Sequence, residues 1–513
     1  MGIMNFFGRS DKYAKNNKAI DIAYHNRCAR SERNWKAYCR QRYESLQAPQ
    51  QDKISDMGAV SSYIDRIVSF THSSVWEYSL DFPQSLSEAQ QAKVNELLEY
   101  VRTVQKNNPM PSISIELGYS CAVDGDFFIV PQPDSEDSLL RDYTMSFDDQ
   151  INTNADMSIK FFVIKPLHVY DFVLAPDNRT MTYICLKFPV TKIVNGQRVD
   201  HIFKQEITPD TVVETIETTD GTLVQGPEER QNPVGVVYAI HAKNYPIPSK
   251  WGLDDVDGLL DVSDEINKKI HNISNIIDYH EEPTIAIFGA RAKSIEKGVR
   301  KVWAGFPANA KIEVIKNEAD LEASVKFLEQ LKQSLQQQSG VNDAALGSED
   351  LVSNVSGSAM QLRFYPLISK AALKWASWDA AIRDLAKMVL LWGRVLNHIN
   401  FEPGDLRNLL NSLEITFKSN LPTNEKEDIQ NSTNKLHAGI TTFARELRRM
   451  GDRNPGQTLD TLEAELKARP VLMGMLGMQN IVTSQAEGQE RDKRSSNTAP
   501  DGTPVDPPDE VES

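Results

Sequence analysis

Residues 232–280 read NPVGVVYAIHAKNYPIPSKWGLDDVDGLLDVSDEINKKIHNISNIIDYH and change character at Gly252. Up to that glycine the chain is extended and punctuated by prolines. After it, apolar residues recur three and four positions apart, which is the spacing of one helix face. We therefore predict a long helix from about Leu253 to His280, which Pro283 ends. Its apolar face comprises Leu259, Leu260, Ile266, Ile270, Ile273 and Ile277.

The residues after this helix alternate between element types. Two β-like runs, TIAIF and IEVIK, flank a basic segment within residues 285–316. A second helix follows and ends at Gly340. Its apolar stripe consists of Leu321, Val325, Leu328, Leu331 and Leu335. Residues 341–355, VNDAALGSEDLVSNV, are polar and predict a loop.

A very long helix then begins, which Ser356 can cap. Pro366 lies inside it and should kink it, because proline lacks an N–H and clashes with the preceding turn. Apolar residues continue in steps of four and three, and this stripe is more typical of core or subunit packing than of a ligand box. They are Ala371, Trp375, Trp378, Ile382, Leu385, Val389, Trp392 and Leu396.

Upstream, residues 113–240 favour a mostly antiparallel β region, with runs such as SISIEL and MTYICLKFPV. Asn195-Gly196 and Asp220-Gly221 each predict a two-residue hairpin turn. Before this region we predict helices at 55–70 and 85–105. The second of these opens with the capping-box spacing of Ser85-Leu-Ser-Glu88.

The two ends of the chain differ in charge. The first 45 residues hold ten basic and four acidic residues with interleaved aromatics. This pattern fits a helix that touches nucleic acid or an acidic neighbouring subunit, and equally a solvated amphipathic helix. Near the other end, LEITFKSNLP resembles a strand, and helices are predicted at 425–450 and 457–467. The tail, 484–513, has eight acids, three bases and no aromatic residue, which predicts disorder.

The overall composition is that of a folded protein. The 513 residues include 40% hydrophobic residues and carry a formal charge of −15. Apolar residues are too plentiful for a disordered acidic protein, and the charge argues against a general nucleic-acid binder. Four scattered cysteines indicate reduced thiols rather than a disulfide framework. Neither a signal peptide nor a membrane helix is predicted.

Motifs for catalysis are lacking in the sequence. It contains no Walker A motif, dinucleotide fingerprint, HExxH or nucleophile elbow, so we predict no enzyme activity, cofactor or metal. One cluster, Glu116 with Asp124 and Asp126, resembles the carboxylates of a metal-dependent nuclease. A tight Asp-Gly turn between two strands is the favoured explanation of the same residues.

Three segments in this order resemble the portal, or head-to-tail connector, proteins of tailed bacteriophages, especially the siphophage type. They are GLDDVDGLLDVSDEIN at 252–267, EPTIAIFG at 282–289 and SNVSGSA at 353–359. The likeness in element order extends over about residues 10–470. It implies an α+β portal fold and a ring, usually of twelve subunits, at one capsid vertex.

The resemblance also implies how this chain is divided. The parts are the wing at 1–252, stem helix 1 at 253–281, the clip at 282–316, stem helix 2 at 317–340, the tunnel loop at 341–355, the long kinked helix and a wing strand at 356–421, the crown at 422–483 and the acidic tail at 484–513.

Charge differs between these parts. Residues 253–282 hold nine acids and two bases, whereas 285–316 hold seven bases and two acids. An acidic channel suits a protein that DNA must pass without sticking, because basic residues provide the attraction for phosphates. The stem acids can equally lie on outer faces, or stabilise the helix start through Asp254, Asp255 and Asp257.

The resemblance implies two sets of site residues. Tunnel-loop residues expected to face DNA are Asn342, Asp343, Ser348, Glu349, Asp350, Ser353 and Asn354. Clip residues expected to dock partners are Arg291, Lys293, Lys297, Arg300, Lys301 and Trp303.

The implied partners are other copies of the chain, double-stranded DNA, the terminase large subunit, a head–tail adaptor or neck protein, and the major capsid and scaffolding proteins. Assembly would occur in the host cytoplasm, and the mature location would be the virion. Two rival functions stay open: another head-completion or minor capsid protein, and the nuclease built on Glu116, Asp124 and Asp126.

Overall fold

The computed structural model describes residues 10–43, 54–83, 85–133, 159–177, 179–194, 197–281, 284–289, 310–315, 321–347, 357–418, 425–450, 452 and 455–468. The chain divides into two compact units, Met1–Pro422 (unit 1) and Thr423–Ser513 (unit 2). Among the described helices, none is long and apolar enough to cross a membrane. The predicted acidic tail lies outside the described residues.

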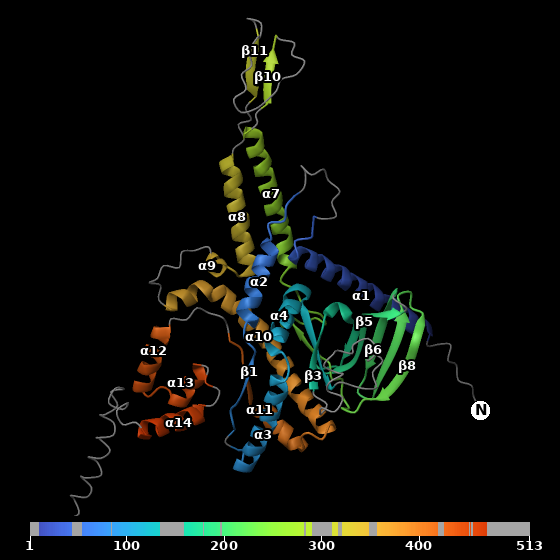
Figure 1. Cartoon of the computed structure of the whole chain (residues 1–513), viewed down its shortest axis with the longest axis vertical. Helices are drawn as coiled ribbons and strands as arrows, with labels where there is room; N and C mark the ends of the chain where they lie inside the picture. The colour runs from blue at the N-terminus through green and yellow to red at the C-terminus, as the bar shows by residue number, and fades with distance from the viewer. Residues whose placement is uncertain are drawn as a thin grey trace, which may run out of the picture. The chain divides into compact units, whose positions relative to one another are not determined.

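Unit 1 contains an antiparallel five-stranded sheet in the order β4-β5-β6-β7-β8 (Figure 1). Val194 of β5 pairs with Gln197 of β6, as expected for the hairpin predicted there, and the turn residues Asn195-Gly196 themselves lie outside the described residues. The hairpin at Asp220-Gly221 also forms, but residues 219–222 separate its strands, so a two-residue turn was wrong there. The strands are β4 (Val169–Leu174), β5 (Met181–Val194), β6 (Gln197–Ile207), β7 (Thr211–Thr218) and β8 (Leu223–Gln231).

A smaller antiparallel sheet has the order β3-β2-β9, with β2 at Asp126–Pro133, β3 at Ile159–Ile164 and β9 at Ile240–Lys243. The strand predicted at SISIEL is wrong, because those residues belong to helix α4, Met110–Asp124. Alternating Ile113, Ile115 and Leu117 suit a strand, yet Ile113 and Leu117 are also one helical turn apart. Both are buried, whereas Ile115 is 41% exposed, so the helical face is the one that packs.

The Asp-Gly turn predicted between two strands is also wrong. Asp124 is the last residue of α4, and Gly125 caps the helix with a φ of 91° before β2 begins. The backbone of Gly252 lies directly against this cap. A Cβ added to Gly252 would lie 2.0 Å from the carbonyl oxygen of Gly125, so only glycine fits at the start of the 252–267 motif.

Helix α10, Gly357–Val395, lies at the centre of the hydrophobic core and contacts β2, β9 and α3. The predicted seam is confirmed, since Trp378, Ile382, Leu385 and Val389 are each at most 1% exposed. The stripe therefore belongs to the core. Pro366 lies inside α10, and Figure 1 shows the helix bending along its length.

In the described part of the chain, three further helices precede α4: α1 (Ser10–Tyr38), α2 (Ala59–His72) and α3 (Glu88–Lys106). The capping box of α3 is real but uses other residues than predicted. Ser87 caps the helix, its hydroxyl accepts from the Gln90 N–H, and its own N–H donates to Gln90 Oε1 at 3.0 Å. After α10, helix α11 (Pro403–Ser412) leads into β12 (Leu413–Thr416), which pairs with β1 (Glu77–Leu80) and confirms the strand predicted there.

Unit 2 contains α12 (Glu425–His437), α13 (Phe443–Arg449) and α14 (Pro455–Ala468). The single helix predicted over 425–450 is wrong, because Gly439 takes a φ of 66° and ends α12. The Ile440 N–H donates to the Lys435 carbonyl and closes the helix end. Glu446 accepts hydrogen bonds from Ser432 Oγ and Arg449 Nε, which joins α12 to α13.

Candidate DNA channel and docking surface

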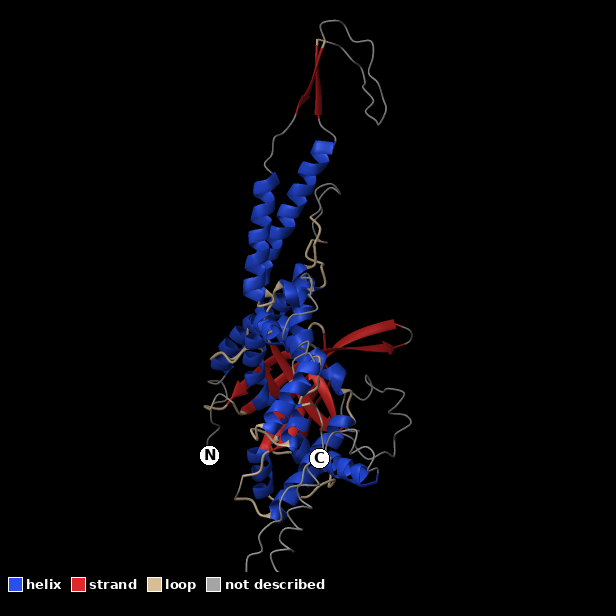
Figure 2. Cartoon of the chain, turned by 90° about the vertical axis from the view of Figure 1, so that its left-hand side faces the viewer, coloured by secondary structure: helices blue, strands red, loops and turns tan. Residues whose placement is uncertain are grey.

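Two helices, α7 (Asp257–Glu281) and α8 (Leu321–Ser339), lie side by side and run antiparallel (Figures 1 and 2). They are the two helices predicted around the basic segment. The hairpin of β10 (Thr284–Phe288) and β11 (Lys311–Ile315) connects them, with Thr284 paired to Ile315. The near end of the pair is anchored in unit 1, where Leu259, Ile266 and Leu335 are buried in one cluster. Chain order thus places the hairpin at the far end.

The start of α7 is fixed by two neighbouring aspartates with different roles. Asp254 Oδ1 accepts from the N–H groups of Val256 and Asp257, so its predicted role at the helix start is confirmed. Asp255 instead points into the core and is 1% exposed at its side chain. Its carboxylate contacts Lys374 Nζ and lies 3.0 Å from Lys370 Nζ, both on α10.

The Asp255 cluster contains further donors. Asn244 Nδ2 and the Tyr245 hydroxyl donate to the carboxylate, and Lys374 Nζ also donates to Asn244 Oδ1 at 2.7 Å. Burial alone would raise the pKa of Asp255, but the charges of Lys374 and Lys370 outweigh it and hold that pKa well below its usual value. This cluster joins the base of α7 to α10 and to the segment after β9.

His72, the last residue of α2, is buried beside this cluster, and its ring stacks on Trp378 with centroids 4.1 Å apart. Burial and the nearby Lys374 charge lower the pKa of His72 well below its ordinary value, so the folded imidazole is neutral. In the unfolded chain it protonates below about pH 6.5. Acidification through that value therefore favours unfolding.

Replacing His72 with phenylalanine is expected to flatten the pH dependence of stability between pH 6.5 and 5. The variant lacks one group that binds a proton only in the unfolded state. The slope of the free energy of unfolding against pH should therefore fall by about 1.4 kcal/mol per pH unit. Denaturant unfolding of wild type and variant at a series of pH values measures this difference. Equal slopes for the two proteins would show that His72 protonates freely in the fold.

The basic helix α1 and the residues after it bind the acidic start of α7. Arg33 Nη2 lies 2.5 Å from Asp257 Oδ1, and Arg42 Nη1 lies 2.6 Å from Asp264 Oδ1. Arg30 approaches Asp254 at 3.8 Å. The basic first 45 residues and the acidic residues 253–282 are thus partly paired with each other within one chain, an arrangement that neither expectation for the basic helix anticipated.

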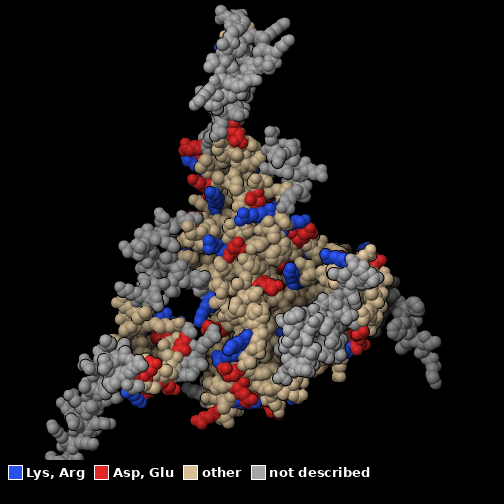
Figure 3. Space-filling model, viewed as in Figure 1, with Lys and Arg blue, Asp and Glu red and all other residues tan. Residues whose placement is uncertain are grey.

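This pairing reduces the number of acidic residues of α7 and its start that are free to face the predicted channel. Asp254, Asp255, Asp257 and Asp264 are held by the contacts above, and Glu265 lies 3.7 Å from Lys269. Within the described residues, Asp261 and Asp278 are exposed and form no ion pair. On the face shown in Figure 3, acidic and basic side chains alternate over the α7–α8 pair.

Part of the predicted polar loop is helical. The short helix α9, Asp343–Leu346, follows Gly340, whose φ of 72° reverses the chain after α8. Asn342 caps α9 by accepting from the Ala345 N–H, and its Nδ2 donates to the Arg363 carbonyl. Asp343 is exposed and accepts from Gln336. Of the predicted loop residues, Asp343 is therefore free to face solvent, while Asn342 has a structural task.

The remaining predicted site residues lie outside the described residues. In the loop these are Ser348, Glu349, Asp350, Ser353 and Asn354, and in the clip they are Arg291, Lys293, Lys297, Arg300, Lys301 and Trp303.

The nuclease cluster does not assemble. Asp124 Oδ1 accepts from Ser31 Oγ at 2.6 Å, and both its oxygens accept from the Trp35 indole N–H. Burial raises the pKa of Asp124 to about 6. Asp126 binds His241 Nε2 and the Gly252 N–H. Both carboxylates thus serve as internal hydrogen-bond acceptors that fasten α1 to α4 and β2 to Gly252.

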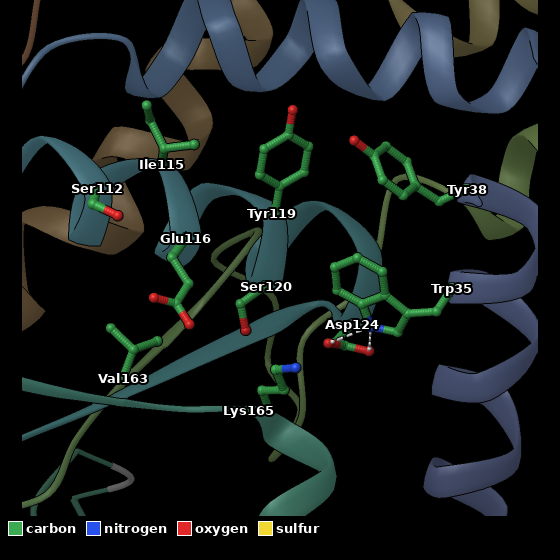
Figure 4. A pocket seen from close by; sticks show the side chains of 10 residues that line it. All are labelled: Trp35, Tyr38, Ser112, Ile115, Glu116, Tyr119, Ser120, Asp124, Val163 and Lys165. Atoms are coloured by element: carbon green, nitrogen blue, oxygen red, sulfur yellow. Dashed lines mark hydrogen bonds between the residues drawn. The ribbon is translucent and has the colours of Figure 1, made fainter. Parts of the chain in front are cut away.

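Glu116 and Asp124 line a pocket of about 450 Å³ between α1, α4 and β3 (Figure 4). Its other walls include Trp35, Tyr38 and Tyr119, and the Asp124 carboxylate is turned toward the Trp35 indole. Nowhere in the described part of the chain do three His, Cys, Asp or Glu side chains come together as a metal site. The pocket does not present the paired carboxylates that metal-dependent hydrolysis needs.

Comparison with known proteins gives one family. Residues 11–450 match the family model described as phage portal protein, SPP1 Gp6-like. No curated protein matches the chain. A chain in the solved structure of the neck of an empty GTA particle, computed with C6 symmetry, aligns over 76% of this chain and 90% of its own length, with 11% identity and a TM-score of 0.38. Because the family match spans most of the sequence, the chain belongs to the SPP1 Gp6-like family of phage portal proteins, structural proteins of the capsid vertex.

Proposed function

We propose that twelve copies of the chain form a ring at one capsid vertex and that double-stranded DNA enters and leaves the head through the channel of this ring. The family match over residues 11–450 is the observation that supports this most strongly. The order of α7, the β10–β11 hairpin and α8 agrees with a stem, a clip and a second stem helix. Residues 1–252 with 356–421 would form the wing, and 422–483 the crown.

The ring would exchange partners during assembly. In the host cytoplasm it would meet major capsid and scaffolding proteins, then dock the terminase large subunit during packaging and a head–tail adaptor afterwards. ATP hydrolysis would belong to the terminase, in keeping with the lack of a Walker A motif in this sequence. The chain itself would contribute structure, a channel wall and docking surfaces, without a cofactor.

Negative-stain electron microscopy of the purified chain tests the proposal. Rings with a central hole are the expected result, and counting their subunits tests the number twelve. A compact monomer at every concentration would instead favour another head-completion protein. DNA cleavage that requires magnesium and is abolished by Asp124→Ala would favour the nuclease. Against that function, the Asp124 carboxylate already accepts hydrogen bonds from Ser31 and Trp35.

Deleting residues 346–353 is expected to leave ring assembly intact and to lower the retention of packaged DNA severalfold. The proposed reason is that the loops of all copies contact the duplex weakly and move as it passes, so that packaged DNA slips back more readily when they are absent. Asn342, which caps α9, is left in position. DNA retained in heads after nuclease treatment measures the effect. Normal packaging and retention in the deletion variant would contradict a channel role for the loop.

A further inference from the structure

The β5–β6 hairpin extends beyond the sheet to which it belongs. β4 pairs with β5 only from Met181 to Leu186, and β7 pairs with β6 only from His201 to Ile207. Residues 187–194 and 197–200, which we term the arm, therefore have no described strand on either side of the two-stranded hairpin. Figure 2 shows this hairpin projecting from the body of unit 1.

A two-stranded hairpin is at best marginally stable in water unless something covers it. Phe188 at the base of the arm packs against Phe203, but Pro189, Arg198 and Val199 farther out are exposed. Arg198 Nε lies 2.9 Å from Asp200 on the same strand, and both of these side chains face solvent. The outer arm thus offers an apolar residue next to a guanidinium.

The edge of the same sheet offers exposed apolar residues next to acidic ones. The edge strand β4 is covered, since Arg27 of α1 donates to the Val169 carbonyl at 2.5 Å. The other edge strand, β8, has no described strand on its outer side. Leu223 and Val224 at its start are 51% and 49% exposed, and Glu228 and Glu229 near its end are exposed acids. Unpaired edges of this kind are contact surfaces for other chains.

We propose that the arm of one copy packs against β8 of the next copy around the ring. This inference rests on the proposed ring. Head-to-tail closure needs two different surfaces that fit each other, and unit 1 has an apolar, basic arm and an apolar, acidic strand edge. They cannot meet within one copy, because β7 lies between the arm strands and β8, whose open edge faces away. Opposite charges fix the register of such a contact.

Charge exchange tests the contact. Arg198→Glu, and separately the pair Glu228→Lys with Glu229→Lys, are each expected to raise the concentration at which half the chains are in rings by about tenfold, because like charges then face each other. Combining the three changes is expected to restore the value to within about threefold. Sedimentation velocity over a concentration series measures this midpoint. Arg179→Glu, an exposed charge in the β4–β5 turn, is the matched control and should leave it unchanged.

The outcomes separate the two proposals. Rings whose midpoint is unaffected by either charge reversal would overturn the arm contact and leave the portal function standing. Weakening by both reversals without rescue in the combined variant would also overturn it, because the charges would then not face each other. A wild-type chain that stays monomeric throughout would contradict both proposals. Unchanged circular dichroism and thermal unfolding of each variant establish that the effects arise from assembly.

Discussion

Replacing Asp255 with asparagine is expected to lower the free energy of unfolding by about 3–5 kcal/mol. The substitution leaves Lys374, with 1% of its side chain exposed, and the half-buried Lys370 without a counter-charge. An amide also gives the Lys374 ammonium a much weaker acceptor than a carboxylate. Denaturant unfolding monitored by circular dichroism measures the loss.

Two variants distinguish this mechanism from a general disturbance of α7. Asp261→Asn makes the same chemical change at an exposed position of the helix and should cost no more than about 0.5 kcal/mol. Combining Asp255→Asn with Lys374→Met removes one of the two stranded charges and should recover part of the loss. A change of less than 1 kcal/mol for Asp255→Asn would show that the cluster is not a buried ion pair in solution.

The same cluster has a definite pH signature. The pKa of Asp255 is lower in the folded chain than in the unfolded chain, so its contribution is fully present above the unfolded value near 4. It is lost as pH falls below that value. The difference in the free energy of unfolding between wild type and Asp255→Asn should therefore shrink in acid, and the two denaturant unfolding curves should approach each other.

Local periodicity predicted the helices of unit 1 wherever one face is apolar over many turns. The seam of α10, the helices α7 and α8 and the pairing of β5 with β6 follow from residues close together in the chain. The helix α4 was missed because Ile113, Ile115 and Leu117 fit both a strand and a helix. Pro111 in its first turn was the available signal, since proline is favoured where a helix begins.

The ion pairs at the start of α7 could not be predicted from local patterns. Asp255 and Lys374 are 119 residues apart, and Arg42 and Asp264 are 222 apart. The charge totals of single segments identified a basic region at residues 1–45 and an acidic region at residues 253–282. They did not show that these two regions bind each other. With that pairing, the acidic total of residues 253–282 overstates the charge that DNA would meet in the proposed channel, and Asp261 and Asp278 become the residues of α7 to test.

Reversing Lys297, Arg300 and Lys301 to glutamate is expected to abolish motor or adaptor docking while rings still form. Residues 285–316 change from five net positive charges to one net negative charge per copy, and a ring repeats that change in every subunit. Charge repulsion of this kind suppresses association, because charges that approach without a counter-ion cost several kcal/mol. Counting DNA-filled heads and completed necks measures the effect.

A control with the same charge change keeps this prediction specific to the clip. Reversing Lys106, Arg179 and Arg407, which are exposed on α3, the β4–β5 turn and α11, alters net charge equally and should leave packaging intact. Loss of rings in the clip variant would mean that these bases bind neighbouring clips instead of external partners. Normal packaging and neck completion by the clip variant would remove the docking role altogether. Because the α7–α8 pair separates the hairpin from the core along the chain, folding of unit 1 should be unaffected, so each outcome can be read as an assembly effect.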